Sequence, residues 1–533
     1  MSALVTPDEM RAAEAAAVAA GRPEPDLMHE AASLIADWLD THISAPPQRQ
    51  RVAFAFVGPG NNGGDALVAL SLLVERGWIA HAHYLGRTQP GALPVSTDLL
   101  SQVKTVDLTA LDHADIILDG VYGVGGRAKL PTDIAGAFRN AYDRRVLRGT
   151  PLIAIDVPSG VDPGTGEADE DAFTADVTLC LGLPKIGLVR EPAASHVGEL
   201  VMLDIGIPQP AFMHERPTLI SEPFVRRALP VRRASAHKHQ TGTILVIGGA
   251  PTYYGAPRLT AESAARAGAG LICVAIPSPI APVVAAQVPE LVLLPLDDSP
   301  QQSVRQVVEW ITQRDGKIDA CVIGPGLGQS SRATVLLEGL LGDASDGLLT
   351  HTRGDQRCRI VLDADALNWI AKRGEFPRSI QPGTAVLTPH VGELSRLTGK
   401  PPSDLLRDPI QSARDAAARF EQAVIFKTGF AVVADPGGAV AVAPRAAPEL
   451  ATAGTGDVLA GLVGGLIAQG LELFTASQVA VYVGSHAGRR ARSVRGIHGV
   501  LARDVIDEIP SVMHRLSSAV TIRDQDGIVR EEM

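Results

Sequence analysis

Aromatic residues, cysteines and long apolar runs are all scarce in this sequence. Phe, Trp and Tyr make up 4% of the 533 residues, and the four cysteines, Cys180, Cys273, Cys321 and Cys358, lie far apart. No Cys-x-x-Cys pair and no Cys/His metal spacing occurs, so we expect reduced, buried thiols in place of disulfides or a zinc site. No apolar stretch reaches the roughly 18 residues that span a bilayer, and the first residues do not resemble a signal peptide. These absences predict a cytoplasmic protein with no membrane partner.

An excess of positive charge is missing as well. The formal net charge is -11, whereas a nucleic-acid partner requires a basic surface. A phosphorylated small molecule remains compatible with this charge, because backbone N–H groups at a helix N-terminus can hold a phosphate. We therefore expect small-molecule partners and no nucleic acid.

The length of the chain requires more than one hydrophobic core. Hydrophobic residues make up 46% of the sequence, which excludes wholesale disorder. The segment Thr6-Pro7-Asp8-Glu9 predicts a helix start, with a capping hydroxyl, a proline at the first helical position and acids in the first turn. We expect helices at 7–20 and 26–42, and a rhythm of short strands after them.

Short apolar runs followed by Gly, Asp, Pro or Asn recur through both halves of the chain. The expected strands are 51–57, 79–85, 115–118, 152–155 and 177–181, and then 243–247, 271–275, 320–323, 360–362, 385–387 and 424–426. Strands that alternate with helices predict an α/β fold, a mostly parallel sheet with helices on both faces. The proline-rich segment 206–223 predicts a linker. We therefore expect a Rossmann-like three-layer αβα domain at 1–215, a second α/β domain at 224–512 and a charged tail at 513–533.

The first candidate site follows the expected strand 51–57. Gly58-Pro-Gly-Asn-Asn-Gly-Gly-Asp65 comes next, and a helix is expected from Ala66. Bare N–H groups at such a corner favour an anion, and the asparagine amides suit a cation or a ribose. A plain β–α turn that uses Asn and Gly for their conformation is the structural alternative.

Two more strand ends place polar groups at the same edge of the sheet. Asp119 precedes a glycine-rich loop, and Asp156 and Ser159 follow the strand at 152–155. Asn62, Asp119 and Ser159 together would offer oxygen ligands to a hard cation of low charge, and they suit zinc poorly. The alternative is that Asp119 and Asp156 only cap helices.

These motifs, GPGNNGGD, LDGVYGVGGR, IDVPSG and Leu183-Pro-Lys185, resemble the NAD(P)H-hydrate epimerase domain. The resemblance implies interconversion of the R and S epimers of hydrated NAD(P)H, with Asp156 as the acid/base, and a potassium ion held by Asn62, Asp119 and Ser159. The implied substrate contacts are Asn61, Asn62, Gly63, Gly64, Asp65, Gly123, Val124, Gly125, Gly126, Arg127, Ala128, Lys129 and Asp156. Where the family usually has Gly after NNGGD, this chain has Ala66, and we expect little loss.

The second candidate site centres on Ala451-Thr-Ala-Gly-Thr-Gly-Asp457, which runs into an apolar helix. Consecutive N–H groups at that N-terminus can hold developing phosphate charge. Asp457 can then act as a general base on a substrate hydroxyl beside the phosphate. An acid that only favours the helix dipole is the alternative reading.

Other strand ends of the second half supply fitting groups. Gly324-Pro-Gly-Leu-Gly328 is glycine-rich, and Asp363-Ala-Asp365 places two carboxylates where a magnesium–phosphate complex could lie. Thr388-Pro-His390-Val-Gly-Glu393 brings an imidazole and an acid. Lys427 follows the strand at 424–426, which suits it to a nucleotide phosphate or a neighbouring acid. Asp363 could equally cap a helix, and His390 and Lys427 could be structural or solvated residues.

GTGD in this setting resembles the ribokinase-like superfamily. The full set of motifs in this half is similar to the ADP-dependent NAD(P)H-hydrate dehydratase. These motifs are His237-Lys-His-Gln-Thr-Gly242, Tyr254-Gly-Ala-Pro257, GPGLG, DADAL, LTPHVGE and GTGDVLAGL. The resemblance implies a ribokinase-like three-layer αβα domain that uses ADP and Mg²⁺. The implied hydrate contacts are Ala256, Gly326, His390 and Asp457, and the implied ADP contacts are Lys427, Thr428, Gly429, Phe430, Ala431, Ala453, Gly454, Thr455 and Gly456. His239 and Ala453 depart from the family's HKG and GGTGD. Neither change removes a side chain with an assigned role.

An epimerase followed by a dehydratase resembles the bifunctional NAD(P)H-hydrate repair enzymes, and we expect a homo-oligomer. A vitamin or sugar kinase with an accessory domain is the rival, since GTGD suits both, but TPHxGE favours repair. A second rival makes the first half an inactive scaffold. The presence together of Asn62, Asp119, Asp156 and Ser159 argues against it.

Overall fold

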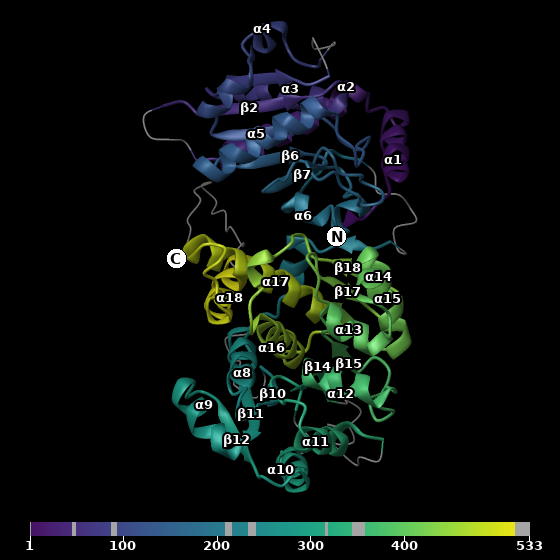
Figure 1. Ribbon diagram of the computed structural model, residues 1–533, viewed down its shortest axis with the longest axis vertical. Helices are drawn as coiled ribbons and strands as arrows, with labels where there is room; N and C mark the ends of the chain where they lie inside the picture. Colours follow the sequence, from purple (N-terminus) through teal and green to yellow (C-terminus); the bar gives the residue numbers. More distant parts are fainter. Residues whose placement is uncertain are drawn as a thin grey trace, which may run out of the picture. The chain divides into compact units, whose positions relative to one another are not determined.

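The computed structural model describes residues 2–44, 49–86, 93–207, 216–232, 241–314, 318–343 and 358–517, which form two compact units (Figure 1). One unit consists of Ser2–Leu219 and Pro444–Ala446, and the other of Ile220–Ala443 and the chain from Ala447. The division falls inside the expected linker. The linker is not wholly irregular, because β9 (Thr218–Leu219) pairs antiparallel with β1 (Ser2–Ala3). Strand β9 is only two residues long, which is too short for a periodic apolar pattern to reveal it.

The N-terminal unit contains a seven-stranded parallel sheet in the order β4-β3-β2-β5-β6-β7-β8. Its strands are β2 (Val52–Val57), β3 (Ile79–Tyr84), β4 (Lys104–Thr105), β5 (Ile116–Gly120), β6 (Leu152–Ile155), β7 (Val177–Leu181) and β8 (Glu199–Leu203). Its α-helices are α1 (Pro7–Ala19), α2 (Glu24–His42), α3 (Asn61–Glu75), α4 (Thr97–Leu100), α5 (Thr132–Arg148) and α6 (Ala194–Val197). The predicted parallel α/β sheet is confirmed, with β4 and β8 as strands that the apolar pattern did not reveal.

Alternating side chains of β2 separate the two cores of this unit. Ala53, Ala55 and Val57 pack with α1, α2 and α3, whereas Phe54 and Phe56 pack with α5. The α1 start is as predicted. The Thr6 hydroxyl accepts from the Glu9 N–H, and the Glu9 carboxylate accepts from the Thr6 N–H.

Helix α3 begins five residues earlier than the sequence predicted. The predicted turn at Asn61–Asp65 is the first part of the helix, and Gly60 is the N-cap. Gly and Asn are poor helix formers, but tertiary packing overrides this preference. A Cβ on Gly63 would lie 2.1 Å from the carbonyl oxygen of Gly58, so the helix approaches the preceding loop as only glycine permits. The buried Ala66 faces Gly120, where an added Cβ would lie 2.5 Å from the Ala66 Cβ.

The C-terminal unit is built on a sheet with the strand order β18-β17-β16-β15-β14-β13-β10-β11-β12. From β16 to β12 all neighbours are parallel, and β17 and β18 are antiparallel additions. The strands are β10 (Thr243–Ile247), β11 (Leu271–Pro277), β12 (Val292–Leu296), β13 (Ala320–Ile323), β14 (Arg359–Leu362), β15 (Ala385–Leu387), β16 (Ala423–Phe426), β17 (Val432–Ala434) and β18 (Val440–Val442). The α/β class predicted for this half is confirmed.

Two groups of helices cover this sheet on its opposite sides (Figure 1). On one side lie α7 (Glu222–Ala228), α8 (Gly255–Arg266), α9 (Ala281–Gln287), α16 (Thr455–Ala468), α17 (Leu473–Arg495) and α18 (Ala502–Ser517). The remaining helices are α10 (Pro300–Thr312), α11 (Ser331–Leu341), α12 (Asp365–Arg373), α13 (Val391–Thr398), α14 (Pro402–Arg407) and α15 (Pro409–Phe420). Helix α18 continues five residues beyond the domain end expected at 512.

The glycines of α16 allow close packing against α8 and the sheet. A Cβ on Gly461 would lie 2.1 Å from the Thr260 carbonyl oxygen, and one on Gly464 would lie 2.6 Å from Val322 Cγ2. The Ser263 hydroxyl donates to the Val458 carbonyl across the same contact. This packing fixes the position of the N-terminus of α16, which carries Asp457.

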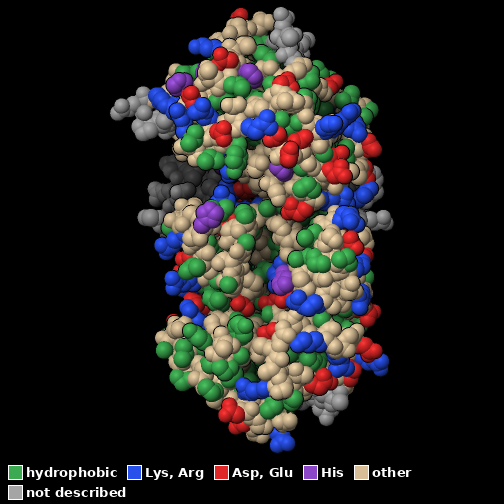
Figure 2. All heavy atoms as spheres, viewed as in Figure 1, with side chains coloured by type: hydrophobic (Ala, Val, Ile, Leu, Met, Phe, Trp, Pro, Cys, Tyr) green, Lys and Arg blue, Asp and Glu red, His purple; other side chains and the backbone are tan. Residues whose placement is uncertain are grey.

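Within the described residues all four cysteines are buried and free, as predicted. None of the helices in the described residues has the length and apolar character that crossing a bilayer requires. Acidic and basic side chains are interspersed on the face of the described residues drawn in Figure 2, without a continuous basic patch. The motif residues 237–240 and the tail from 518 lie outside the described residues.

Candidate active sites

Asp119 and Ser159 hold one another at the carboxyl ends of β5 and β6. The Ser159 hydroxyl donates to Asp119 Oδ1 at 2.7 Å, and the Ser159 N–H donates to Oδ2 at 2.7 Å. The Val121 N–H completes the set at 3.1 Å from Oδ1. Both side chains are fully buried. Burial raises the pKa of Asp119 to about 6, although the hydrogen bonds from Ser159 and Val121 act in the opposite direction. Asp119 does not cap a helix.

Asn62 joins this pair through the backbone of Tyr122. The Asn62 amide donates to the carbonyl oxygens of Tyr122 (2.9 Å) and Ile155 (3.1 Å), and the Tyr122 N–H donates to the Ser159 hydroxyl (2.9 Å). The structure therefore brings Asn62, Asp119 and Ser159 to one place, as the sequence predicted.

The chemistry of this donor set fits a monovalent cation. It offers amide, hydroxyl and carboxylate oxygens. In the described part of the chain, the groups that lower the pKa of the buried Asp119 carboxyl are Ser159 and Val121, and neither is a cation. Among the described residues no group of three or more His, Cys, Asp and Glu is arranged to hold a metal, so a transition-metal site is not found there.

Asp156 lies beside this group with one carboxylate oxygen engaged. Oδ1 accepts from the Leu181 N–H at 3.1 Å and from the ammonium of Lys185. Oδ2 faces Gly123, since a Cβ built there would lie 3.2 Å from Asp156 Oδ2 and 3.2 Å from Asn62 Oδ1. Asp156 has φ 67°, a left-handed conformation that is costly for an aspartate. It does not cap a helix either.

Lys185 is a residue whose contact with Asp156 sequence reasoning missed. The motif Leu183-Pro-Lys185 drew attention to it, but only the fold reveals that its side chain is fully buried against Asp156.

Two further acids lie near Asp156. Burial, followed by the charge of Asp156, raises the pKa of Asp65 well above its usual value. The pKa of Glu14 on α1 is also raised, chiefly by burial. No sequence signal pointed to Glu14.

The other predicted contacts of this site surround the same edge. The Asn61 amide donates to Glu24 on α2 at 2.5 Å. Gly126 donates its N–H to the Gly123 carbonyl, which closes a turn, and Arg127 and Lys129 are exposed. The loop from Gly123 to Lys129 thus flanks the open oxygen of Asp156 and presents two cations to solvent.

In the C-terminal unit, Asp457 is the third residue of α16, and Gly454 caps the helix in a left-handed conformation. The side chain is partly exposed. Burial, followed by the charge of Asp363, raises the pKa of Asp457 to about 7, and Lys427 opposes this shift. A carboxyl with such a pKa can take up a proton and release it near neutrality.

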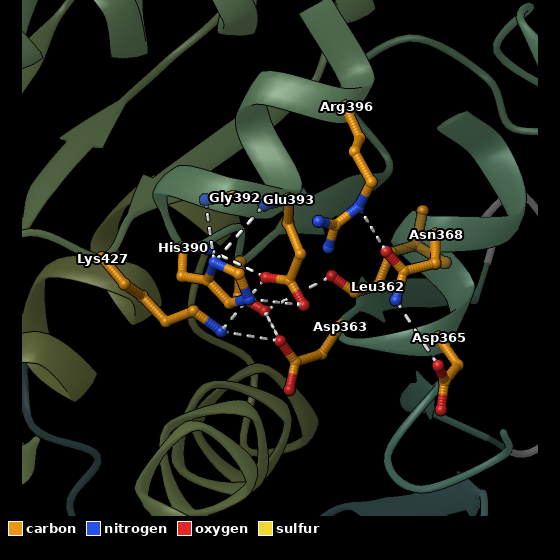
Figure 3. A network of polar contacts seen from close by, with 10 residues as sticks. Leu362, Asp363, Asp365, Asn368, His390, Gly392, Glu393, Arg396 and Lys427 are labelled. Carbon is orange, nitrogen blue, oxygen red and sulfur yellow. Dashed lines mark hydrogen bonds and ion pairs between the residues drawn. The ribbon is translucent and has the colours of Figure 1, made fainter. Parts of the chain in front are cut away.

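Asp363, at the end of β14, anchors a network shown in Figure 3. It is buried, and its Oδ1 accepts from the Thr388 hydroxyl at 2.6 Å and from the Lys427 ammonium at 3.0 Å. The ammonium also lies 3.9 Å from a carboxylate oxygen of Glu393. Burial lowers the pKa of Lys427, but the charges of Asp363 and Glu393 outweigh it and the pKa is raised. Lys427 is paired with acids, which excludes the alternative of a solvated lysine at the end of a strand.

His390 and Glu393 form a reciprocal cap at the start of α13. His390 Nδ1 accepts from the N–H groups of Gly392 (3.0 Å) and Glu393 (3.3 Å), and the Glu393 carboxylate accepts from the His390 N–H at 2.9 Å. Nδ1 is therefore unprotonated, and Nε2 carries the proton of the neutral ring. Burial and Lys427 lower the pKa of His390. The imidazole is half exposed, and its Nε2 lies 3.5 Å from a carboxylate oxygen of Glu393.

Two glycine-rich contacts shape the rest of this edge. Asp365 accepts from the Gly328 N–H at 2.7 Å and thereby fixes the GPGLG loop. Gly326 has φ 64°, and a Cβ there would lie 2.9 Å from the Ala256 Cβ. The predicted contacts Ala256 and Gly326 are thus neighbours.

The residues predicted to contact ADP lie on two segments. The ammonium of Lys427 is 3.4 Å from where a Cβ on Gly456 would lie, so the two segments meet there. Thr455 turns its hydroxyl inward to the carbonyls of Leu450 and Thr452. Phe430 is fully buried, so its ring packs in the core and only its backbone can face a ligand.

The fold and these sites define a two-domain α/β enzyme. The family described as "NAD(P)H-hydrate dehydratase" matches residues 244–511, and the family "YjeF-related protein N-terminus" matches residues 24–187. The chain is similar to bifunctional NAD(P)H-hydrate repair enzymes from Moorella thermoacetica (31% identity, 96% of both chains covered) and Coxiella burnetii (33% identity, 96% of this chain and 99% of the relative covered). The chain belongs to the bifunctional NAD(P)H-hydrate repair enzyme family, with an epimerase domain followed by a dehydratase domain.

A solved structure is also similar to the C-terminal unit. The ADP/ATP-dependent NAD(P)H-hydrate dehydratase of Bacillus subtilis, co-crystallised with ATP/Mg²⁺, is 28% identical and has a TM-score of 0.46. The match covers 56% of this chain and 99% of that one.

Proposed function

We propose that the chain repairs hydrated NAD(P)H in two steps. The N-terminal domain interconverts the R and S epimers of the hydrate, and the C-terminal domain dehydrates the S epimer at the expense of ADP, which gives NAD(P)H, AMP and phosphate. The observation that carries the proposal is Asp457, a carboxyl with its pKa raised to about 7 at the start of a helix beside Lys427. A base of this kind suits removal of a proton from a substrate hydroxyl at neutral pH.

In the dehydratase domain each residue then has a defined task. Asp457 takes the proton of the hydrate's hydroxyl while the N–H groups of Ala453–Gly456 and the Lys427 ammonium hold the phosphates of ADP. Ala256, Gly326 and His390 contact the hydrate. Mg²⁺, when bound, neutralises phosphate charge. The hydroxyl attacks the terminal phosphoryl group of ADP, which forms a phosphoester and releases AMP. The C–O bond of the ester then breaks and phosphate leaves, while the adjacent ring carbon loses a proton to solvent and the ring regains its double bond.

In the epimerase domain Asp156 exchanges a proton with the substrate through its open oxygen. Residues 61–65 and the loop from Gly123 to Lys129 contact the hydrate, and the exposed Arg127 and Lys129 suit its phosphates. Asn62, Asp119 and Ser159 hold potassium, whose charge compensates the buried Asp119 carboxylate.

Fusion of the two domains serves this chemistry. A dehydratase that accepts only the S epimer leaves the R epimer behind, and an attached epimerase supplies it. A kinase reading differs in its product, since a kinase would leave a stable phosphoester.

The test is to incubate the chain with mixed hydrate epimers, Mg²⁺ and either ADP or ATP, and to follow the absorbance of reduced nicotinamide. We expect full recovery with AMP and phosphate as products of ADP. Recovery of the S share alone, after correction for spontaneous epimerisation, would mean that the first domain is inactive. A phosphorylated hydrate that persists would support a kinase instead.

A further inference from the structure

Lys185 has no task in the proposed chemistry, yet it is one of the most deeply buried charged residues of the N-terminal unit. Its side chain is 0% exposed, and its partner Asp156 is 9% exposed. Burying an ammonium is expensive unless it is paired and all its donors are used. The contacts of the Lys185 ammonium must therefore offset the cost of burying it.

The ammonium of Lys185 uses all three of its N–H donors. They go to Asp156 Oδ1, to the Leu181 carbonyl at 3.0 Å and to Cys180 Sγ at 3.8 Å. Burial lowers the pKa of Lys185, but the charge of Asp156 outweighs it, so the pKa is raised and the ammonium stays protonated. The last two acceptors lie in or beside β7, so the lysine connects Asp156, after β6, to the next strand.

These contacts divide the Asp156 carboxylate into two unlike oxygens. Oδ1 accepts from Lys185 and from the Leu181 N–H, which occupies it. Oδ2 is the oxygen that faces Gly123 together with Asn62 Oδ1. A carboxylate held in this way cannot rotate to exchange its oxygens, and its left-handed backbone is held by the same contacts.

Several acids lie around Asp156, so its carboxylate depends on the positive charge of Lys185. After burial, the charge of Asp156 contributes to the raised pKa of Asp65 on α3 and of Glu14 on α1, and Glu24 of α2 acts on both acids. Among these groups Lys185 is the cation in contact with Asp156. Without Lys185, the neighbouring acids would favour an Asp156 side chain that turns away or binds a proton.

We propose that Lys185 is a positioning residue of the epimerase site, which locks Oδ1 of Asp156 so that Oδ2 alone accepts and returns the proton of the substrate hydroxyl. As the O–H bond of the substrate breaks and the Oδ2–H bond forms, the hydroxyl oxygen becomes a carbonyl oxygen and the neighbouring C–N bond of the ring breaks, with its electron pair left on nitrogen. When that nitrogen attacks either face of the carbonyl carbon, the C–N bond forms again and Oδ2 returns the proton to oxygen. Lys185 itself does not touch the substrate. This inference rests on the proposed epimerase function.

The experiment uses the full chain with the R epimer, ADP and Mg²⁺, and measures the S epimer in parallel as an internal control for the second domain. Lys185→Met keeps most of the length of the side chain, one heavy atom less, and removes its charge. We expect kcat for the R epimer to fall about 100-fold with KM within about threefold, since geometry at the reacting atom is lost and substrate contacts are kept. Turnover of the S epimer stays unchanged. Lys104→Met, at an exposed lysine of the same sheet, leaves both rates unchanged.

A double-variant cycle separates this role from mere support of the fold. Lys185→Met alone lowers the melting temperature because a buried carboxylate loses its partner. The double variant Asp156→Asn/Lys185→Met recovers part of the lost melting temperature but no activity. Its activity equals that of Asp156→Asn alone, so removal of Lys185 costs nothing further in that background. If Lys185→Met does not fold, Lys185→Arg takes its place. It keeps the charge with another geometry, and kcat still falls about tenfold.

A Lys185 variant with kcat within about threefold of the wild type would overturn the proposal. Equal losses from removing Lys185 in the wild-type and Asp156→Asn backgrounds would overturn it as well. Failure of the function itself looks different, because the wild-type chain would then process the R epimer no faster than it epimerises spontaneously.

Discussion

The Lys427 ammonium lies 3.0 Å from Asp363 Oδ1, and the two charges act in opposite directions on a third group, Asp457. Asp363 raises the pKa of Asp457 and Lys427 lowers it, after burial as the main cause. A general base works in its ionised form, so the dehydration rate should rise with pH through about 7.

Single substitutions in this pair should move that pH profile in opposite directions. Asp363→Asn removes a negative neighbour, so the rise shifts to lower pH. Lys427→Met removes a positive neighbour, so the rise shifts to higher pH, each by about one unit. The measurement is kcat/KM of ADP-dependent dehydration of the S epimer against pH. Asp404→Asn, on the outlying helix α14, is the control. Shifts of the same sign in both variants would refute this description of Asp457.

Gly123 is expected to be required by the epimerase alone. A methyl group there would lie 3.2 Å from both Asn62 Oδ1 and Asp156 Oδ2. Gly123→Ala should therefore slow conversion of the R epimer by about tenfold or more, since about 1.4 kcal/mol corresponds to tenfold. Gly125 of the same loop has nothing within 4 Å of an added Cβ, so Gly125→Ala serves as the matched control. Equal activity of the two variants would mean that Oδ2 does not face the substrate.

Asp119 is expected to make epimerisation respond to potassium. Its folded-state pKa of about 6 lies above the 3.8 of a free aspartate, so the carboxylate is present above about pH 6 and is lost as the pH falls through that value. Potassium activation should weaken in the same window. Asp119→Asn should raise the potassium concentration for half-activation by about tenfold at pH 8. Asp133→Asn, exposed on α5, should not change it. Potassium dependence that survives in Asp119→Asn would place the ion elsewhere.

The packing of α16 on α8 leads to a stability prediction. A Cβ on Gly461 would lie 2.1 Å from the Thr260 carbonyl oxygen, whereas one on Gly484 of α17 makes ordinary contact at 3.4 Å. Gly461→Ala should destabilise the C-terminal unit by about 1–3 kcal/mol or more. Gly484→Ala should be neutral or slightly stabilising because alanine favours the helix. Thermal unfolding of both variants decides the matter, and an unchanged melting temperature for Gly461→Ala would count against the packing described.

Much of the fold could be predicted from local patterns. The capping box of Thr6 and Glu9 and the apolar runs that became β6, β7, β10, β13 and β15 depend on neighbouring residues only. The start of α3 at Asn61 could not be predicted in this way. Its Gly and Asn residues disfavour a helix, and the contacts that override them come from Gly58, Tyr122 and Ile155.

The candidate sites show the same division. Strand-end reasoning correctly brought Asn62, Asp119 and Ser159 together. The ion pair of Lys185 with Asp156 could not be foreseen, because it joins residues that follow different strands and whose side-chain directions the sequence does not reveal. A phosphate or a neighbouring acid was expected beside Lys427, and the fold identifies that acid as Asp363. The cap that His390 forms on α13 was missed because Ser, Thr, Asp and Asn are the usual capping residues.

Asp457→Asn tests the central claim most directly, and its stability can be predicted beforehand. The folded-state pKa of about 7 exceeds the 3.8 of an exposed aspartate, so ionisation of Asp457 destabilises the folded state. This cost grows from about pH 4 to about pH 7 and stays constant at higher pH. Asparagine carries no such cost. The variant should therefore melt no lower than the wild type at pH 8, and a loss of activity would not be a loss of fold.

The measurement is the return of reduced-nicotinamide absorbance from the S epimer with ADP and Mg²⁺, for Asp457→Asn and the wild type at pH 8. We predict that the variant loses turnover by a factor of about 10³ or more while it still converts the R epimer to the S epimer. Turnover of the S epimer by Asp457→Asn at the wild-type rate would contradict the account.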